Sequence, residues 1–232
     1  MKPLIIANWK MNPVSQKEAE NIFKGIRKGI KKVKSEVVVC PPFIYLSELN
    51  GITLGAQDVF FMDNGAFTGE ISAEMLKNLG VEYVIIGHSE RRRYFGETDE
   101  IIRKKISKAS QFGLKVIFCC GETIEEKTAG KKEEILKRQI TKGLSRINDN
   151  INIVYEPVWA IGTGNNCGVE EAKETINFIR KIAGGAVRVL YGGSVKSENS
   201  GEYIKSSGAN GLLVGGASLD AEEFVKIVKS AE

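Results

Sequence analysis

The chain has 232 residues, a length that suits one large α/β domain or two small ones. Its 42% hydrophobic and 27% charged residues are typical of a soluble globular protein, whose core at this size needs no disulfide or metal. The net charge of +4 is too small to indicate nucleic acid, and no stretch is apolar and long enough for a signal peptide or a membrane span. We therefore expect a cytoplasmic protein with neither nucleic acid nor membrane as a partner.

Eight short apolar runs, many of them β-branched, recur along the chain and predict eight strands. Most runs are continuously apolar rather than alternating, which is the pattern of strands buried on both faces in a parallel sheet. In chain order the predicted strands are Leu4–Trp9, Val37–Cys40, Ile52–Gln57, Tyr83–Gly87, Lys115–Cys119, Asn152–Glu156, Arg188–Tyr191 and Gly211–Val214.

Amphipathic segments between these runs predict helices. In chain order the clearest are Ser15–Lys32, Ile101–Phe112, Glu125–Ile147, Val169–Ala183 and Ala221–Lys229. In one of them Val169, Ala172, Ile176 and Ile179 follow helical spacing. The lysine-rich stretches 24–34 and 127–137 are interpreted as solvated helix faces, because no aromatic residues accompany them for stacking on nucleic acid bases.

The series of strand and helix units defines the fold class. Eight units in 232 residues give each unit about 29 residues, close to the length of a βαβ crossover. No linker or change of composition divides the chain. Two doubly wound halves are the alternative, but the uninterrupted series favours a closed (β/α)8 barrel, one α/β domain over residues 1–232.

Residues with ionisable or amide side chains stand at the ends of predicted strands. In such a barrel all strand ends lie on a single rim. Asn8 and Lys10 close the first strand, His88 follows the fourth, and Glu156 ends the sixth. Each alone has a plain structural interpretation, such as a solvated lysine or a helix-capping carboxylate. Because the barrel predicts that they meet on one rim, together they indicate a base, an electrophile and a cation.

Glycine-rich turns after late strands add a predicted phosphate-binding element. They are GTG (162–164), GGS (192–194) and VGGA (214–217). One such turn is weak evidence, since any tight turn uses glycine. Two of them after strands 7 and 8 match the place where barrels of this class bind phosphate through backbone N–H groups. No P-loop sequence is present, so nucleoside triphosphate chemistry is not expected.

The cysteines and the single histidine give no sign of a metal site. Cys40, Cys119, Cys120 and Cys167 lack the spacing of zinc ligands, and three of them end apolar runs, where a buried free thiol is expected. No cofactor is predicted. A base, a donor, a cation and a phosphate site then indicate proton transfer beside a carbonyl, as in the isomerisation of a small sugar phosphate.

Two rival functions stay open at this point. One is another phosphate-binding (β/α)8 barrel, such as an aldolase or an indole-forming synthase. A Schiff-base aldolase would need a lysine deeper in the barrel than the rim position of Lys10. An inactive barrel that binds partners through its basic helices would be expected to lack a base or a phosphate-binding glycine, and this chain has both.

Seven motifs, in order along the whole chain, resemble the triosephosphate isomerase family. They are ANWKMN (7–12), GAFTGE (65–70), IIGHSERR (85–92), GET (121–123), YEPVWAIGTG (155–164), YGGSV (191–195) and GLLVGGASL (211–219). The resemblance implies a TIM barrel that interconverts D-glyceraldehyde 3-phosphate and dihydroxyacetone phosphate, without a cofactor, in glycolysis and gluconeogenesis. One departure is NNCG (165–168), where the family commonly has a lysine.

The resemblance also implies roles for the residues of the proton transfer. Glu156 would be the base that shuttles the proton through an enediolate, and His88 a neutral imidazole that polarises the carbonyl. The helix beginning at Ser89 and Glu90 would keep this imidazole uncharged, because its positive end disfavours a second positive charge. Lys10 would supply a fixed positive charge and pair with Glu90, and Asn8 would orient a substrate oxygen.

For the substrate phosphate, the resemblance implies binding by Gly162, Ser194, Gly215 and Gly216, beneath a lid formed by Pro157 to Thr163.

A homodimer is also implied by the resemblance. The loop Gly65–Glu70 would join the two subunits, with Thr68 reaching the neighbour's site beside Asn8 and Lys10. The sequence does not decide between a dimer and a tetramer.

Overall fold

The structure is a computed structural model that describes residues 1–144, 150–161, 166–184 and 187–232. Eight parallel strands close into a barrel in chain order, and β8 pairs with β1. The strands are β1 (Leu4–Asn8), β2 (Glu36–Cys40), β3 (Thr53–Ala56), β4 (Tyr83–Ile86), β5 (Lys115–Cys120), β6 (Ile151–Tyr155), β7 (Arg188–Tyr191) and β8 (Gly211–Val214). The predicted closed (β/α)8 barrel is confirmed, and the doubly wound alternative is wrong.

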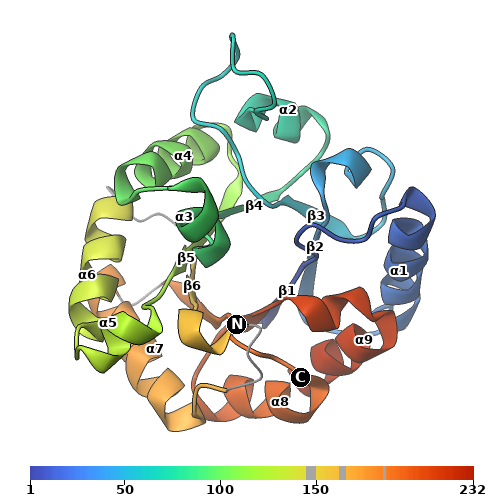
Figure 1. Ribbon diagram of the computed structural model, residues 1–232. Helices are drawn as coiled ribbons and strands as arrows, with labels where there is room; N and C mark the ends of the chain where they lie inside the picture. The colour runs from blue at the N-terminus through green and yellow to red at the C-terminus, as the bar shows by residue number, and fades with distance from the viewer. Residues whose placement is uncertain (145–149, 162–165, 185–186) are drawn as a thin grey trace.

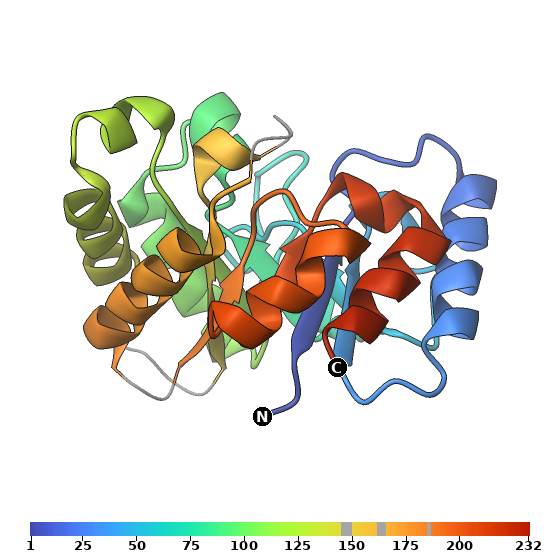
Figure 2. The same cartoon turned by 90° about the horizontal axis from the view of Figure 1, so that it is seen from below.

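Helices surround the barrel on its outside (Figure 1). Within the described residues they are α1 (Gln16–Gly29), α2 (Ala73–Asn78), α3 (Ser89–Phe95), α4 (Asp99–Gln111), α5 (Ile124–Thr128), α6 (Lys132–Gly143), α7 (Val169–Ala183), α8 (Ser197–Ser206) and α9 (Ala221–Ser230), with 3₁₀ helices η1 (Phe43–Tyr45), η2 (Val158–Ala160) and η3 (Gly216–Leu219). Figure 2 shows the N-terminus at the end of the barrel opposite to η2. The segments that follow the strands therefore form the far rim.

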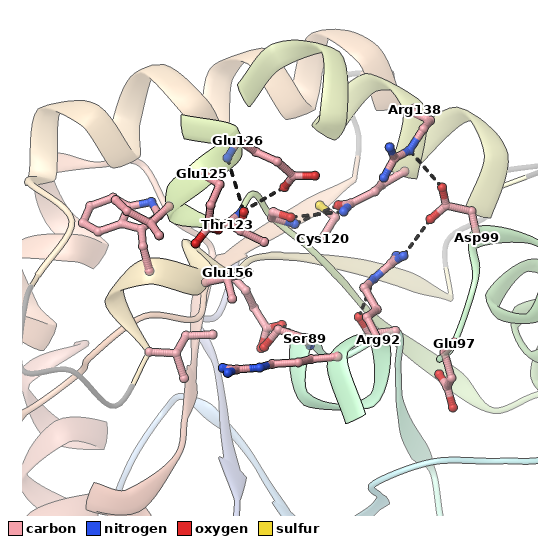
Figure 3. A pocket seen from close by; sticks show the side chains of 18 of the residues that line it. Ser89, Arg92, Glu97, Asp99, Cys120, Thr123, Glu125, Glu126, Arg138 and Glu156 are labelled. Carbon is pink, nitrogen blue, oxygen red and sulfur yellow. Dashed lines mark hydrogen bonds and ion pairs between the residues drawn. The ribbon is translucent and has the colours of Figure 1, made fainter. Parts of the chain in front are cut away.

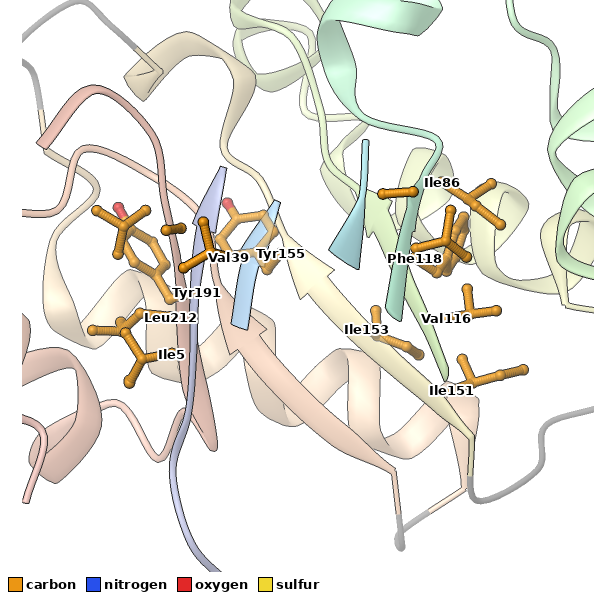
Figure 4. Packing of buried hydrophobic residues seen from close by; sticks show 14 of the residues in the cluster. Ile5, Val39, Ile86, Val116, Phe118, Ile151, Ile153, Tyr155, Tyr191 and Leu212 are labelled. Atoms are coloured by element: carbon orange, nitrogen blue, oxygen red, sulfur yellow. The ribbon is translucent and has the colours of Figure 1, made fainter. Parts of the chain in front are cut away.

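Both faces of the strands are buried, which explains their continuous apolar sequence. In β1, Leu4 and Ile6 belong to the cluster inside the barrel, whereas Ile5 and Ala7 belong to the larger cluster between strands and helices. Figure 4 shows part of this larger cluster, with Phe118 of β5 among the outward-facing side chains. Burial on both sides is what the absence of alternation indicated.

The predicted helix Glu125–Ile147 is wrong as one element, because the chain forms α5 and α6 instead. Gly130 lies between them in the left-handed region with φ 69°, a conformation that glycine adopts without steric cost. Its N–H donates to the carbonyl of Lys127 at the end of α5, and the chain turns there. Residues 145–149 lie outside the described part of the chain.

Helix α8 was given no bounds from the sequence, although the eight strand and helix units implied a helix between the last two strands. Its segment SENSGEYIKS contains three serines, an asparagine and a glycine, all weak helix formers, and few apolar residues to mark a buried face. Tyr203 is nevertheless almost fully buried. Tertiary packing thus outweighs local propensity here.

A buried ion cluster holds α3 against α4 and the segment after β3. The Nζ atom of Lys105 lies 2.7 Å from both carboxylate oxygens of Asp58 and 2.5 Å from Oε1 of Glu97. Arg91 of α3 contacts the same two carboxylates, at 2.8 Å and 2.6 Å. Burial raises the pKa of Asp58 above its ordinary value, and Lys105 opposes that rise. The cluster fixes α3, the helix that begins at the predicted site.

The four cysteines are free and buried, which was predicted for Cys40, Cys119 and Cys120 from the apolar runs that they end; Cys167 is buried as well. Burial raises the pKa of each thiol, to about 12 for Cys167. All four are therefore neutral thiols. No helix among the described residues has the length and apolar character of a membrane span.

Candidate active site

A cavity of about 510 Å³ opens on the rim where the strands end. Seven predicted site residues line it together, although up to 208 positions of sequence separate them: Asn8, Lys10, His88, Glu156, Ser194, Gly215 and Gly216. Gly162 lies outside the described residues, as do the last residues of the predicted lid. The barrel therefore brings the predicted base, donor and cation to one place.

Lys10 sits in a strained backbone conformation that its neighbours hold. Its φ of 54° lies in the left-handed region, which is uncommon for a residue with a side chain. Its N–H donates to Oδ1 of Asn8 at 3.1 Å, and its carbonyl accepts from Nε2 of Gln57 at 2.8 Å. The Nζ atom lies 2.5 Å from Oε1 of Glu90, the pair that the resemblance implied. These contacts hold Lys10 in place where it lines the cavity.

His88 is the N-cap residue of α3, and this position defines its tautomer. Its Nδ1 accepts a hydrogen bond from the backbone N–H of Glu90 at 3.2 Å. A ring nitrogen that accepts a hydrogen bond carries no proton, so the imidazole is neutral and its proton is on Nε2. That Nε2 lies 3.0 Å from Oε1 of Glu156. His88 therefore presents an N–H donor to the cavity.

Glu156 is 2% exposed and directly follows β6. Besides its contact with His88, its Oε2 accepts from the backbone N–H of Ser89 at 3.1 Å. On the main-chain side, a Cβ atom at Gly121 would lie 1.6 Å from the carbonyl oxygen of Glu156. The carboxylate is therefore almost fully buried where it borders the cavity, and its backbone is pressed against the end of β5.

The far side of the cavity is formed by the turns after β7 and β8. The hydroxyl of Ser194 donates to the carbonyl of Ala160 at 2.6 Å, and Nδ2 of Asn199 donates to the carbonyl of Ser194 at 3.2 Å. Gly215 lies close to Lys10, since a Cβ there would be 3.3 Å from Cε of the lysine. Gly216, at the start of η3, lines this side together with Gly215, and Lys10 lines the same cavity. This side is suited to an anion.

A second and larger cavity of about 930 Å³ also borders Glu156 (Figure 3). Three of its charged residues pair with one another: Asp99 accepts from Arg92 at 2.6 Å and from Arg138 at 3.2 Å. Lys10 and His88 do not line it. The smaller cavity is therefore the candidate active site, because it alone combines the carboxylate with the imidazole and the ammonium group.

Thr68 is the one predicted residue in the described chain that lies far from this cavity. It is exposed in the loop Gly65–Glu70, which projects beyond the ring of helices between β3 and α2 (Figure 1). The loop does not line the cavity of its own chain.

Several supporting residues were given no role by sequence reasoning. Gln57 binds the carbonyls of both Lys10 and Cys40, at 2.8 Å and 2.9 Å. Glu122 is buried, and its Oε1 accepts from Tyr155 at 3.1 Å and from Nε1 of Trp159 at 2.9 Å. Burial raises the pKa of Glu122, while those two donors oppose the rise. Their position at or just after a strand was one signal, and for Glu122 the GET motif (121–123) was another, but neither revealed these partners.

Among the residues that the structure describes, no group of three or more His, Cys, Asp or Glu side chains could hold a metal ion. The chemistry available in this cavity is that of a carboxylate, an N–H donor and an ammonium group. Together they can move a proton and stabilise negative charge on an oxygen.

The chain was compared with known proteins. The model of the family described as triosephosphate isomerase matches residues 3–231. The chain is 46% identical to the protein of that name from Alkaliphilus oremlandii, over 98% of both chains, and 45% identical to that from Thermoanaerobacter pseudethanolicus, again over 98% of both. It is also 46% identical to the triosephosphate isomerase of Aquifex aeolicus, over 99% of this chain and 100% of the relative.

Proposed function

The chain belongs to the triosephosphate isomerase family, and from this premise we propose which of its residues carry out the reaction. The enzyme interconverts D-glyceraldehyde 3-phosphate and dihydroxyacetone phosphate, a step of glycolysis and gluconeogenesis. The reaction moves a proton between two adjacent carbons and passes through an enediolate. It therefore needs a base for the carbon and a group that stabilises the negative oxygen.

Glu156 is the proposed base. Its carboxylate takes the proton from one carbon, the electrons of the C–H bond form the C=C bond of the enediolate, and the π electrons of the C=O bond move onto the carbonyl oxygen. The same proton then returns to the other carbon, while the hydroxyl proton passes to the former carbonyl oxygen and the oxygen that lost it becomes the new carbonyl. The proposal is supported by the burial of Glu156 and by its place between Ser89 and His88. In the free enzyme each of its oxygens has one of these contacts, and a substrate oxygen that takes over the hydrogen bond of His88 would free Oε1 for the carbon proton.

His88 is the proposed donor to the substrate carbonyl. In the free enzyme its Nε2–H faces Oε1 of Glu156 at 3.0 Å, and a substrate oxygen would take the place of that acceptor. The backbone N–H of Glu90 keeps Nδ1 unprotonated, which leaves the imidazole neutral. A neutral N–H donor can donate a hydrogen bond to whichever oxygen of the enediolate carries the negative charge.

Lys10 is proposed to provide the fixed positive charge, and Asn8 to orient a substrate oxygen. The ion pair with Glu90 and the backbone contacts of Lys10 support this role, because they hold the ammonium group before substrate arrives. Ser194, Gly215 and Gly216 are proposed to bind the phosphate. Gly162 remains a prediction from the sequence for the same task.

The observation that carries these assignments is the 3.0 Å contact between His88 and Glu156 in a cavity that Lys10 also lines. A coupled assay with D-glyceraldehyde 3-phosphate, run in the presence of inorganic phosphate, tests them. Phosphate should inhibit competitively, raising KM and leaving kcat unchanged. Inhibition that lowers kcat without changing KM would place the anion outside the substrate site.

We also propose a homodimer in which the loop Gly65–Glu70 of one copy contacts the rim of a second copy. The chain alone leaves large apolar side chains exposed near the site, among them Met11 at 91%, Val14 at 90% and Phe95 at 68%. The projecting loop itself exposes Phe67 at 41%. Exposed apolar groups of this size are typical of a surface that a partner covers. Thr68 would then lie beside Asn8 and Lys10 of the partner.

Replacing Thr68 with arginine is expected to dissociate the dimer and to lower activity at least tenfold, because a charge would be buried without a partner. Sedimentation velocity and the coupled assay measure the two effects. The matched control is Thr141→Arg, on the exposed face of α6, which should leave mass and activity unchanged. A wild-type chain that sediments as a monomer at micromolar concentration would contradict the proposal.

A cytoplasmic location completes the proposal. Its support is the role in glycolysis, together with four cysteines that are all free, as expected in a reducing compartment.

A further inference from the structure

The connection between β6 and α7 borders the active-site cavity near both of its ends, through Ile161 and Asn166. Each of these ends accepts a hydrogen bond from a side chain that follows β7, one from the turn before α8 and one from α8 itself. At the start, the hydroxyl of Ser194 donates to the carbonyl of Ala160 at 2.6 Å. At the end, the phenol of Tyr203 donates to the carbonyl of Cys167 at 2.5 Å.

Tyr203 reaches this carbonyl from α8 and is itself rigidly placed. Its ring is 1% exposed and stacks on that of Tyr191, with centroids 3.9 Å apart and planes 13° apart. The hydroxyl of Tyr191 lies over Gly193, where a Cβ atom would be only 2.2 Å away. Gly193 belongs to the turn that carries Ser194. A continuous path of contacts therefore runs from this turn through both rings to Cys167.

We propose that Tyr203 is a positioning residue for substrate binding. Its hydroxyl fixes the Asn166–Cys167 end of the connection at a defined place relative to the Gly193–Ser194 turn. This end borders the cavity and is already ordered before substrate binds. Binding therefore costs less free energy, because this part of the cavity wall does not have to be ordered. The inference rests on the proposed binding of phosphate at Ser194.

The variant Tyr203→Phe tests this role because it removes the hydroxyl and keeps the stacked ring. The inhibition constant of inorganic phosphate and KM for D-glyceraldehyde 3-phosphate should each rise about fivefold, the effect of losing one hydrogen bond of ordinary net strength. The value of kcat should stay within about twofold, because Glu156, His88 and Lys10 keep their contacts. A hydroxyl that only stabilised the fold would not raise KM while leaving kcat nearly unchanged.

The matched control is Tyr83→Phe. The phenol of Tyr83 is also buried and donates to the carboxylate of Glu36, at the start of β2 and thus at the opposite end of the barrel. Thermal unfolding should show a loss of stability for both variants, whereas only Tyr203→Phe should change the inhibition constant. Equal inhibition constants for Tyr203→Phe and wild type, alongside a lowered Tm, would overturn the proposal. An equal rise in both variants would overturn it as well.

The wild-type enzyme separates this inference from the proposed phosphate site. If phosphate fails to compete with substrate in the wild type, the assignment of Ser194 is wrong. The role of Tyr203 is then decided by KM alone: a rise in Tyr203→Phe that Tyr83→Phe does not share supports it, and an unchanged KM rejects it.

Discussion

The variant Glu156→Gln is expected to lower kcat by 10³- to 10⁴-fold, the upper part of the range that a positioned general base contributes. The amide has nearly the shape of the carboxylate, and its oxygen can still accept from the N–H of Ser89. It cannot take up the proton of the substrate, however. KM should change far less, since Lys10, Ser194 and the glycine turns are untouched.

A series of substitutions separates loss of the base from loss of a buried charge. Glu156→Asp keeps the charge but withdraws the carboxylate by one methylene, and should lose about 10²-fold in kcat. Glu122→Gln neutralises another buried carboxylate near the rim, which contacts Tyr155 and Trp159, and should lose less than tenfold. Steady-state kinetics in the coupled assay measures all three. Comparable losses in Glu122→Gln and Glu156→Gln would remove Glu156 from its role.

The second large effect is expected for His88→Gln, with kcat lowered by 10²- to 10³-fold. Removing one preorganised donor to a developing oxyanion typically costs this much. The substitution also removes the N-cap of α3, where Nδ1 accepts the N–H of Glu90, so thermal unfolding should show a loss of about 1 kcal/mol.

His88→Asn distinguishes the two functions of this residue. Asparagine is a favourable N-cap, so the variant should retain most of the stability of α3. Its short amide cannot reach the place of Nε2, and its kcat should fall as far as that of His88→Gln. Near-normal turnover in either variant would show that the imidazole is not the donor. Recovery of activity together with stability would show that His88 only caps the helix.

The barrel and the position of its site could be predicted because both depend on features that are local in sequence. Strands buried on two faces must be continuously apolar, and parallel strands in a barrel end at one rim. The placement of Asn8, Lys10, His88 and Glu156 around one cavity follows from these two facts. The sequence-derived expectation for these four residues needed no knowledge of side-chain contacts.

Features that depend on tertiary contacts could not be predicted. Helix α8 has a poor helical sequence, and its key residue Tyr203 is defined by contacts with Tyr191 and Cys167. The role of Gln57 is recognised only from its hydrogen bond to the carbonyl of Lys10, a residue 47 positions away in the sequence. The division of Glu125–Ile147 depended on one glycine within an otherwise helical pattern. In each case the deciding partner is distant in sequence or the signal is a single residue.

The contact between Gly121 and the carbonyl of Glu156 limits how this barrel could be redesigned. Substitutions in the turn after β8 could adapt the cavity to ligands of other shapes, whereas at Gly192, after β7, a Cβ atom would lie 3.1 Å from Cγ of Glu156. Any side chain at position 121 would instead push the main chain of Glu156 away from β5. An engineer seeking a different reaction could therefore exchange the carboxylate itself more readily than the glycine beside it.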